Sequence, residues 1–121
     1  MVIGVARAGI ISGGLPTFAF NISSTAANQN LRTLANAAGY TGVGNVKATI
    51  VSGVEIYSTT ASTASLVTGS FPSGVTVTLI NQGTVSGAGG AGGAGNSGAG
   101  GAGGTAFDAS GVSGFTLKVD N

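Results

Sequence analysis

A glycine-rich tract from Gly87 to Gly104, GAGGAGGAGNSGAGGAGG, limits what this chain can fold into more than any other part of the sequence. Glycine recurs at every third position, at Gly89, Gly92, Gly95, Gly98, Gly101 and Gly104. The tract is also a palindrome about its single Asn96-Ser97 pair. A period of three is that of the polyproline II helix, and Asn and Ser are residues that favour turns. The tract therefore predicts two antiparallel polyproline II arms joined by a turn at Asn96 and Ser97.

The backbone groups of such arms lead to an expectation about partners. Each N–H and C=O needs a partner outside its own polyproline II helix, because unpaired buried backbone groups are costly. Two arms would leave most of these groups facing water, whereas three chains would supply enough arms for a bundle with an interior. We therefore expect a homo-oligomer, specifically a homotrimer with closed symmetry. A disordered glycine/alanine linker is the alternative interpretation of this composition.

The rest of the composition indicates one small domain with an unusually neutral surface. The chain has 121 residues, a formal net charge of +1 and only 6% charged residues. Soluble monomers usually present a surface of which about a quarter or more is charged. Nucleic-acid binding requires clustered Lys and Arg, and a membrane span requires about 18 consecutive apolar residues. We expect neither of those two partners, and the neutral surface is typical of proteins that lie inside an assembly.

The hydrophobic pattern divides the chain into an N-terminal arm, residues 1–16, and a single β-rich domain, residues 17–121, that includes the hairpin at 87–104. Apolar residues two positions apart, the pattern of half-buried strands, recur in short runs. These runs are Phe18/Phe20/Ile22, Val46/Ala48/Ile50, Val54/Ile56, Val75/Val77/Leu79 and Phe115/Leu117/Val119. A polar residue and a glycine follow two of the runs, which suggests a weak repeat. The predicted fold is mainly β with one short α-helix, a small β-sandwich or β-solenoid-like body, and the glycine-rich hairpin.

One short helix is predicted after the first strand. Its apolar face consists of Leu31, Leu34, Ala35 and Ala38, spaced at i, i+3, i+4 and i+7. Asn28 or Asn30 is the candidate N-cap, and Gly39 is the candidate left-handed residue at the C-terminal end. A helix of about ten residues is marginal by itself, so it must pack against the strands. Arg32 points away from the apolar face and is expected to be solvated.

Few residues are available for catalytic or metal-binding chemistry. The chain has no histidine and no cysteine, which excludes Ser–His–Asp and Cys–His arrangements and the commonest metal ligands. The three carboxylates, Glu55, Asp108 and Asp120, lie in different segments, so that only a Ser–Lys pair with Lys47 or Lys118 stays open. The glycine tract lacks the lysine of a phosphate-binding loop. We expect no enzymatic activity, no cofactor and no metal.

Three segments, in order, resemble a known family. They are residues 30–42 (NLRTLANAAGYTG), residues 79–87 (LINQGTVSG) and the glycine tract. Together, over residues 18–104, they resemble the glycine-rich modules at the distal ends of bacteriophage and prophage tail fibres and host-specificity (tail tip) proteins. The resemblance implies a structural virion protein that is extracellular when mature, contacts other tail proteins, attaches to the host receptor and assembles with three-fold symmetry. It also implies polyproline II arms packed as a bundle, with loops between the arms that contact the receptor.

The chain departs from that pattern in its one connection between arms, Asn96-Ser97, which is too short for a varied receptor-reading surface. The Thr/Ser-rich loop at 58–70 becomes the candidate receptor contact, although an ordinary solvated loop is the alternative. Its candidate residues are Thr59, Thr60, Ser62 and Thr63. The competing function is ice binding by a flat alanine face on the arms. That face would consist of Ala88, Ala91, Ala94, Ala99 and Ala102, and an ice-recrystallisation assay separates the two functions.

Overall fold

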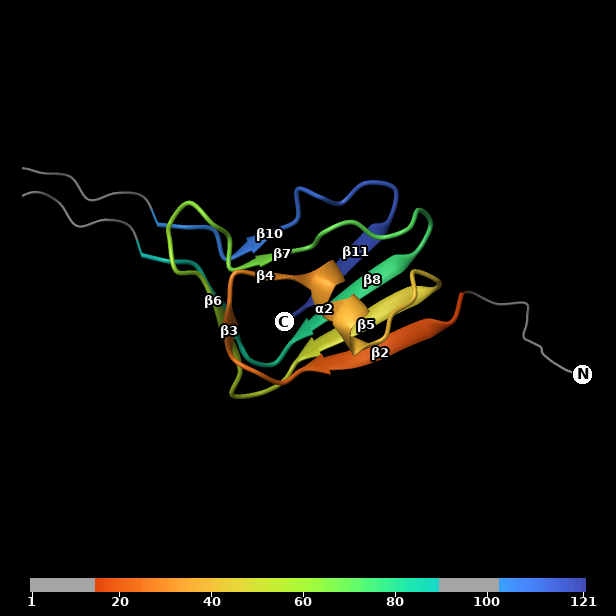
Figure 1. The fold of residues 1–121 in the computed structure, drawn as a ribbon, viewed down its shortest axis with the longest axis horizontal. Coiled ribbons are helices and arrows are strands. Elements are labelled where there is room, and N and C mark those ends of the chain that lie inside the picture. The colour runs from red at the N-terminus through yellow and green to blue at the C-terminus, as the bar shows by residue number, and fades with distance from the viewer. Residues whose placement is uncertain (1–14, 90–102) are drawn as a thin grey trace, which may run out of the picture.

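The computed structural model describes residues 15–89 and 103–121, so of the predicted N-terminal arm only Leu15 and Pro16 are described. Within these residues, short strands and one helix follow one another along the chain (Figure 1). Their order and bounds are β2 (Thr17–Ile22), β3 (Ala26–Ala27), β4 (Gln29–Asn30), α2 (Leu31–Ala38), β5 (Asn45–Ile50), β6 (Glu55–Tyr57), β7 (Leu66–Val67), β8 (Thr76–Asn81), β9 (Thr84–Ser86), β10 (Phe107–Asp108) and β11 (Thr116–Asp120).

The strands form three sheets in which every pairing is parallel. Sheet 1 has the order β11-β8-β5-β2, sheet 2 the order β3-β6-β9 and sheet 3 the order β10-β7-β4. The chain passes through sheets 1, 2 and 3 in turn and then returns to sheet 1 one strand further along. Successive coils therefore stack on one another. The fold is a β-solenoid with three-sided coils, which is one of the two architectures that the hydrophobic pattern predicted.

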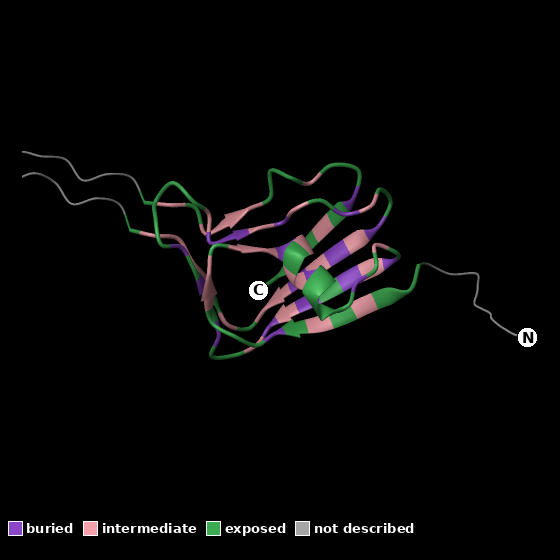
Figure 2. Cartoon of the chain, viewed as in Figure 1, coloured by how far each residue is buried: buried purple, intermediate pink, exposed green. Residues whose placement is uncertain are grey.

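Inward-facing side chains of sheet 1 form rows that run from coil to coil. One row consists of Phe18, Val46, Val77 and Leu117, and the next of Phe20, Ala48 and Leu79, with Val119, which is 53% exposed, in register at its edge. Because side chains alternate across a strand, the same register places an apolar set inside every coil. Figure 2 shows buried positions alternating along β5 and β8, the two inner strands, while β2 and β11 at the edges are more exposed. The core therefore lies against the middle of sheet 1.

Helix α2 belongs to the first coil, where it contacts both β4 and β2. Asn30 is its N-cap, because the Asn30 Oδ1 accepts a hydrogen bond of 3.1 Å from the Thr33 N–H. Gly39, with φ of 119°, ends the helix in the left-handed conformation, and its N–H donates to the Ala35 carbonyl. The predicted caps are confirmed in Asn30 and Gly39. The helix has 8 residues, slightly fewer than expected.

Aromatic rings stack from coil to coil at the corner between sheet 3 and sheet 1, and we call Phe18, Tyr40, Phe71 and Phe115 the aromatic ladder. The ring centroids of Tyr40 and Phe71 lie 6.0 Å apart, and those of Phe71 and Phe115 lie 5.3 Å apart in an edge-on arrangement. Phe18 extends the ladder at 5.8 Å from Tyr40. These separations are in the range that aromatic pairs prefer. The ladder connects the cores of three successive coils.

Arg32 packs on the aromatic ladder, so the expectation that it is solvated was wrong. Its guanidinium carbon lies 5.2 Å from the ring centroid of Tyr40 and 5.5 Å from that of Phe71. The Nη1 group also donates to the Ser70 carbonyl at 2.9 Å. A cation at this distance is attracted by the ring quadrupole. The expectation considered only the helix, whereas the second coil passes beside the helix face that carries Arg32.

Two buried polar residues of the second coil are hydrogen-bonded to the third coil. Ser65 donates its hydroxyl to the Ser86 carbonyl and its N–H to the Thr105 carbonyl, the latter at 3.1 Å. Thr68 donates its N–H and its hydroxyl to the Asp108 carbonyl, at 3.1 and 3.3 Å. Buried polar groups are tolerated when they are paired in this way. The Ser65 bonds reach residues on both sides of the glycine tract, and the Thr68 bonds reach β10 of sheet 3.

Candidate functional site

The corner between sheet 2 and sheet 3 has a different length in each coil, and we call it the insert corner (residues 28, 58–65 and 87–106). In the first coil Asn28 alone joins β3 to β4, with a left-handed φ of 54°. Residues 58–65 connect β6 to β7 in the second coil, and residues 87–106 connect β9 to β10 in the third. Figure 1 shows the second-coil loop beside both described ends of the third-coil connection. Loops that a rigid scaffold positions are common sites of function, so this corner is the first candidate site.

The loop at 58–65 is ordered by its own hydroxyl groups. The buried Ser58 hydroxyl lies 2.7 Å from the Thr60 carbonyl oxygen and 2.6 Å from that of Thr63. Asn28 Nδ2 donates to Thr59 Oγ1 at 2.9 Å, which ties this loop to the first coil. The four candidate receptor contacts therefore lie together on one hydrogen-bonded loop. All four are exposed: Thr59, Thr60, Ser62 and Thr63.

The two ends of the glycine tract lie side by side where the tract leaves the solenoid. The Gly104 N–H donates to the Ala88 carbonyl at 2.7 Å, and a Cβ on Gly87 would collide with the Gly104 carbonyl oxygen. Gly104 also rests on the second-coil loop, because a Cβ on it would lie 3.0 Å from Ala61 Cα. Only glycine permits such close backbone approaches. The base of the insert and the loop at 58–65 thus form one packed surface.

Most of the predicted hairpin lies outside the described residues. This is true of the turn at Asn96 and Ser97 and of four glycines of the register, Gly92, Gly95, Gly98 and Gly101. Gly89 and Gly104 are described, and of the alanine face considered for ice binding only Ala88 is described. The polyproline II arms, the homotrimer and the ice-binding alternative stay predictions.

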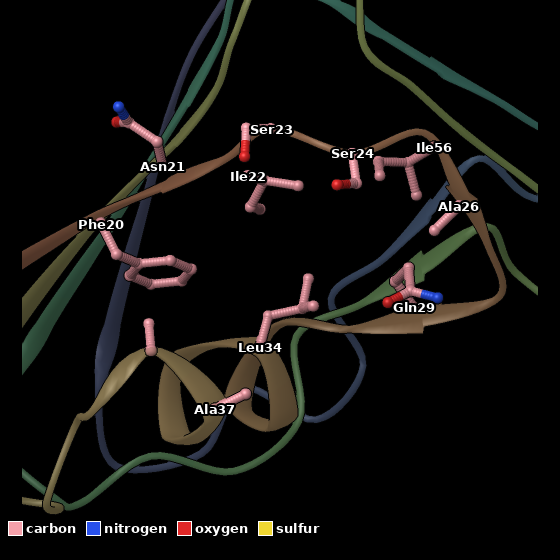
Figure 3. Close-up of a pocket in the computed structure, with 11 residues that line it drawn as sticks. Phe20, Asn21, Ile22, Ser23, Ser24, Ala26, Gln29, Leu34, Ala37 and Ile56 are labelled. Atoms are coloured by element: carbon pink, nitrogen blue, oxygen red, sulfur yellow. The ribbon is translucent and has the colours of Figure 1, made fainter.

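A second candidate site is a groove of about 290 Å³ on the first coil, between β2 and α2 (Figure 3). Phe20 and Leu34 point into this groove, and Ile56 of the second coil contributes to its lining. Ala37 and Ala38 of α2 line its helical side. Further lining residues are Asn21, Ile22, Ser23, Ser24, Ala26 and Gln29. An apolar lining with a few polar groups is typical of binding sites.

Charged groups on the described surface are sparse. Glu55 accepts a hydrogen bond of 2.8 Å from the Ser86 hydroxyl on the outer face of sheet 2. Hydrogen bonds from the side chain and the backbone N–H of Ser110 lower the pKa of the Asp108 carboxyl below its ordinary value. The part of the chain that the structure describes contains no group of three or more His, Cys, Asp or Glu residues that could hold a metal ion. No helix in these residues is long and apolar enough to cross a membrane.

The structure places the receptor candidates together, but two functional features were missed from the sequence. Asn28 was considered only as an N-cap. In the structure it is the single residue that joins β3 to β4 at the insert corner of the first coil. The groove was missed because its lining comes from strands and a helix that are separated along the chain. A signal for it was present in Ala37 and Ala38, two small residues at the end of α2 that line the groove. Small side chains there leave space that larger ones would fill.

Comparison with known proteins identified one family. The model of the family described as phage tail fibre adhesin Gp38 matches residues 17–121. This match spans the described solenoid and the glycine tract, and it extends the tail-fibre resemblance of residues 18–104 to the end of β11. Searches of curated proteins and of solved structures gave no significant match.

Proposed function

Because the chain belongs to the family of phage tail fibre adhesins described as Gp38, we propose that it is a non-enzymatic adhesin that contacts the bacterial receptor with its insert corner. As a member of this family it is a structural protein of the virion tail and is extracellular when mature. The proposed contact rests on the length of the connection at the insert corner. This connection is one residue, Asn28, in the first coil and spans residues 87–106 in the third.

Packing at the insert corner supports a rigid contact surface. Gly104 lies against Ala61, and the Ser65 N–H bonds to the Thr105 carbonyl at 3.1 Å, so the second-coil loop holds the base of the insert at two points. Hydroxyl groups of the loop at 58–65 are held by hydrogen bonds within the loop. A pre-organised polar surface loses little conformational entropy when it binds, which favours affinity.

An arginine in place of Ser62 tests this surface. Ser62 is exposed on the loop, so Ser62→Arg should leave the fold intact while its bulk and charge block a partner. We expect the binding of the purified protein to host cells to weaken about tenfold or more, as for a residue at the centre of an interface. Flow cytometry of labelled protein on the bacterial host measures this change.

Ser52→Arg is the matched control, because Ser52 is exposed on the turn between β5 and β6, at a different corner of the second coil. It should bind host cells as the unmodified protein does. Equal binding by Ser62→Arg and the unmodified protein would place the receptor contact elsewhere. Equal losses in both variants would indicate a general effect of charge and would count against the insert corner.

The groove on the first coil supports attachment to another protein of the tail. It opens at the first coil, whereas the described ends of the insert, residues 87–89 and 103–106, lie in the third, so a chain seated in the groove would keep clear of those ends. Its lining includes Phe20, Leu34 and Ile56, which suit an apolar side chain of that protein. We propose that the groove attaches the adhesin to the tail while the insert corner faces the host.

Ala37→Lys tests the groove. Ala37 is exposed at the groove, and a lysine near the end of α2 suits the helix dipole, so the free energy of unfolding should change by less than about 0.5 kcal/mol. In virions produced with this variant, mass spectrometry should find the protein depleted about tenfold or more. Ser113→Lys, exposed between β10 and β11, is the control and should be incorporated normally. Normal incorporation of Ala37→Lys would count against the groove as the attachment site.

A further inference from the structure

Among the described residues, Tyr57 is the only aromatic residue that is exposed, whereas the others are buried or half-buried. The chain has two Tyr, five Phe and no Trp. The other six pack in or against the core: Phe18, Phe20, Tyr40, Phe71, Phe107 and Phe115. Tyr57, on β6, is 38% exposed on the outer face of sheet 2. Tyrosine at a surface offers an apolar ring and a polar hydroxyl, which is why it is enriched where partners bind.

Polar groups lie beside Tyr57 on the outer face of sheet 2. In the strand register, Tyr57 is flanked by Ala27 of β3 and Ser86 of β9. Glu55 lies two positions before Tyr57, and therefore on the same face of the strand. The Glu55 carboxylate accepts from the Ser86 hydroxyl at 2.8 Å through one of its two oxygens. Because the Ala27 side chain is small, it leaves open space on one side of Tyr57.

Asn28 and Thr59 border the other end of the same strand. The Asn28 N–H donates to the Tyr57 carbonyl at 2.9 Å, and Asn28 Nδ2 donates to Thr59 Oγ1 at 2.9 Å. Because the Thr59 oxygen accepts in this bond, its own proton is available to a ligand. Tyr57 therefore lies between two pairs of polar groups. One pair is the Glu55 carboxylate with the Ser86 hydroxyl, and the other is the Asn28 amide with the Thr59 hydroxyl.

This combination matches the chemistry of a neutral sugar. A pyranose has a face of C–H groups, which suits the negative face of an aromatic ring, and an edge of hydroxyl groups. The hydroxyl edge requires donors and acceptors such as carboxylate, amide and hydroxyl groups. Among the described residues, the cations lie elsewhere: Arg32 packs on the aromatic ladder, and Lys47 and Lys118 belong to strands of sheet 1. Since none of these described cations lies beside Glu55, this face favours a neutral sugar over a phosphorylated or acidic one.

We propose that the outer face of sheet 2 is a saccharide subsite, in which Tyr57 stacks on a neutral pyranose and Glu55, Asn28 and Thr59 bond to its hydroxyl groups. This inference rests on the proposed function, because it names the chemical class of host-surface ligand that the adhesin takes. Thr59 belongs to both surfaces, so the subsite adjoins the receptor contact at the insert corner. A bacterial surface glycan bound here would lie against the loop at 58–65.

The two tyrosines of the chain give a direct test by NMR spectroscopy. With the tyrosine rings labelled, the full-length protein shows Tyr57 at the surface and the buried Tyr40 as an internal reference. Titration with the methyl glycosides of glucose, galactose and N-acetylglucosamine should shift the Tyr57 signals saturably for at least one sugar and leave those of Tyr40 unchanged. No shift at Tyr57 with any of the three, or equal shifts at both rings, overturns the proposal.

Three variants separate ring stacking from a general surface effect. Tyr57→Ala should weaken binding of the preferred glycoside about tenfold or more, whereas Tyr57→Phe, which keeps the ring, should stay within about threefold. Glu55→Gln keeps the shape and removes the charge, and should weaken binding by an intermediate factor. Saccharide binding by Tyr57→Ala as strong as that of the unmodified protein would overturn the proposal.

Host-cell binding keeps this proposal distinct from the proposed function. If the unmodified protein binds host cells but no glycoside moves the Tyr57 signals, the saccharide subsite is wrong and the receptor contact stands. If a glycoside binds at Tyr57 while Ser62→Arg binds host cells normally, the subsite stands and the insert corner is wrong as the receptor contact. Purified lipopolysaccharide and purified capsular polysaccharide of the host, tested separately, then identify the source of the sugar.

Discussion

Replacing Phe71 with alanine should lower the free energy of unfolding by about 3–5 kcal/mol, the usual cost of removing a buried aromatic ring. Phe71 is buried and stands in the middle of the aromatic ladder, with its ring centroid 6.0 Å from that of Tyr40 and 5.3 Å from that of Phe115. Its loss would also remove one of the two rings beneath Arg32. Small domains have a total stability of about 5–15 kcal/mol, so this variant should be close to unfolding.

Urea denaturation followed by circular dichroism measures the loss in the Phe71→Ala variant. Tyr57→Ala is the matched control, since it truncates an exposed ring of similar size and should change the free energy of unfolding by less than about 0.5 kcal/mol. Phe71→Leu, which refills much of the space, should recover part of the stability. If Phe71→Ala were as stable as Tyr57→Ala, the ladder would not connect the coils energetically.

Gly83→Ala should destabilise the protein by about 2–3 kcal/mol, within the range for forcing extra volume into a packed region. A Cβ on Gly83 would collide with the Val54 carbonyl oxygen and lie 2.8 Å from that of Val51. Both obstacles are backbone atoms of the second coil, which cannot move aside as a side chain can. The Gly83 N–H also donates to Asn81 Oδ1 at 3.1 Å, which fixes the turn. The added methyl group would therefore push the second and third coils apart.

Thermal unfolding of Gly83→Ala, read by circular dichroism, should show a clearly lower Tm. Gly89→Ala is the control, because no atom of the described residues lies within 4 Å of a Cβ built there. Alanine at that position should leave the Tm nearly unchanged. A Gly83→Ala variant with the Tm of the Gly89→Ala control would mean that the coils do not pack as closely as described.

The sequence predicted those parts of the fold that depend on interactions between residues close together in the chain. Alternating apolar residues located the long strands of sheet 1, and the Asn30 and Gly39 caps located the helix. Residues 79–87 are one of the three segments that resemble tail-fibre modules, and Gly83 lies within them. In the structure, Gly83 lies against the backbone of the preceding coil.

The parts that were not predicted depend on contacts between coils. Strands β7 and β10 have two residues each, too few for a periodic pattern, and they exist because Leu66 and Phe107 pair across the glycine tract. The aromatic ladder is likewise spaced irregularly in sequence, since the connections in each coil differ in length. Arg32 was misjudged for the same reason, because its partners are supplied by other segments.

The sequence indicated which segments belong to the candidate site, but it did not indicate that these segments contact one another. The hydroxyl-rich loop and the glycine tract were each recognised from sequence, but the contact of Gly104 with Ala61 joins them into one surface. Tyr57 carried no special signal, because in sequence it is one of seven aromatic residues. Tyr57 stands out only in the structure, where the other six aromatic residues pack in or against the core.

The unequal length of the insert corner gives the adhesin a region that can be re-engineered independently of its scaffold. Strands β4, β7 and β10 keep a common register although the connections before them range from one residue to residues 87–106. Doubling a flexible loop adds only about 0.6 kcal/mol of closure entropy, so sequence of new length can be grafted there at little cost to the solenoid. Under the proposed function, loop grafting at the insert corner would exchange the host range and leave the groove on the first coil untouched.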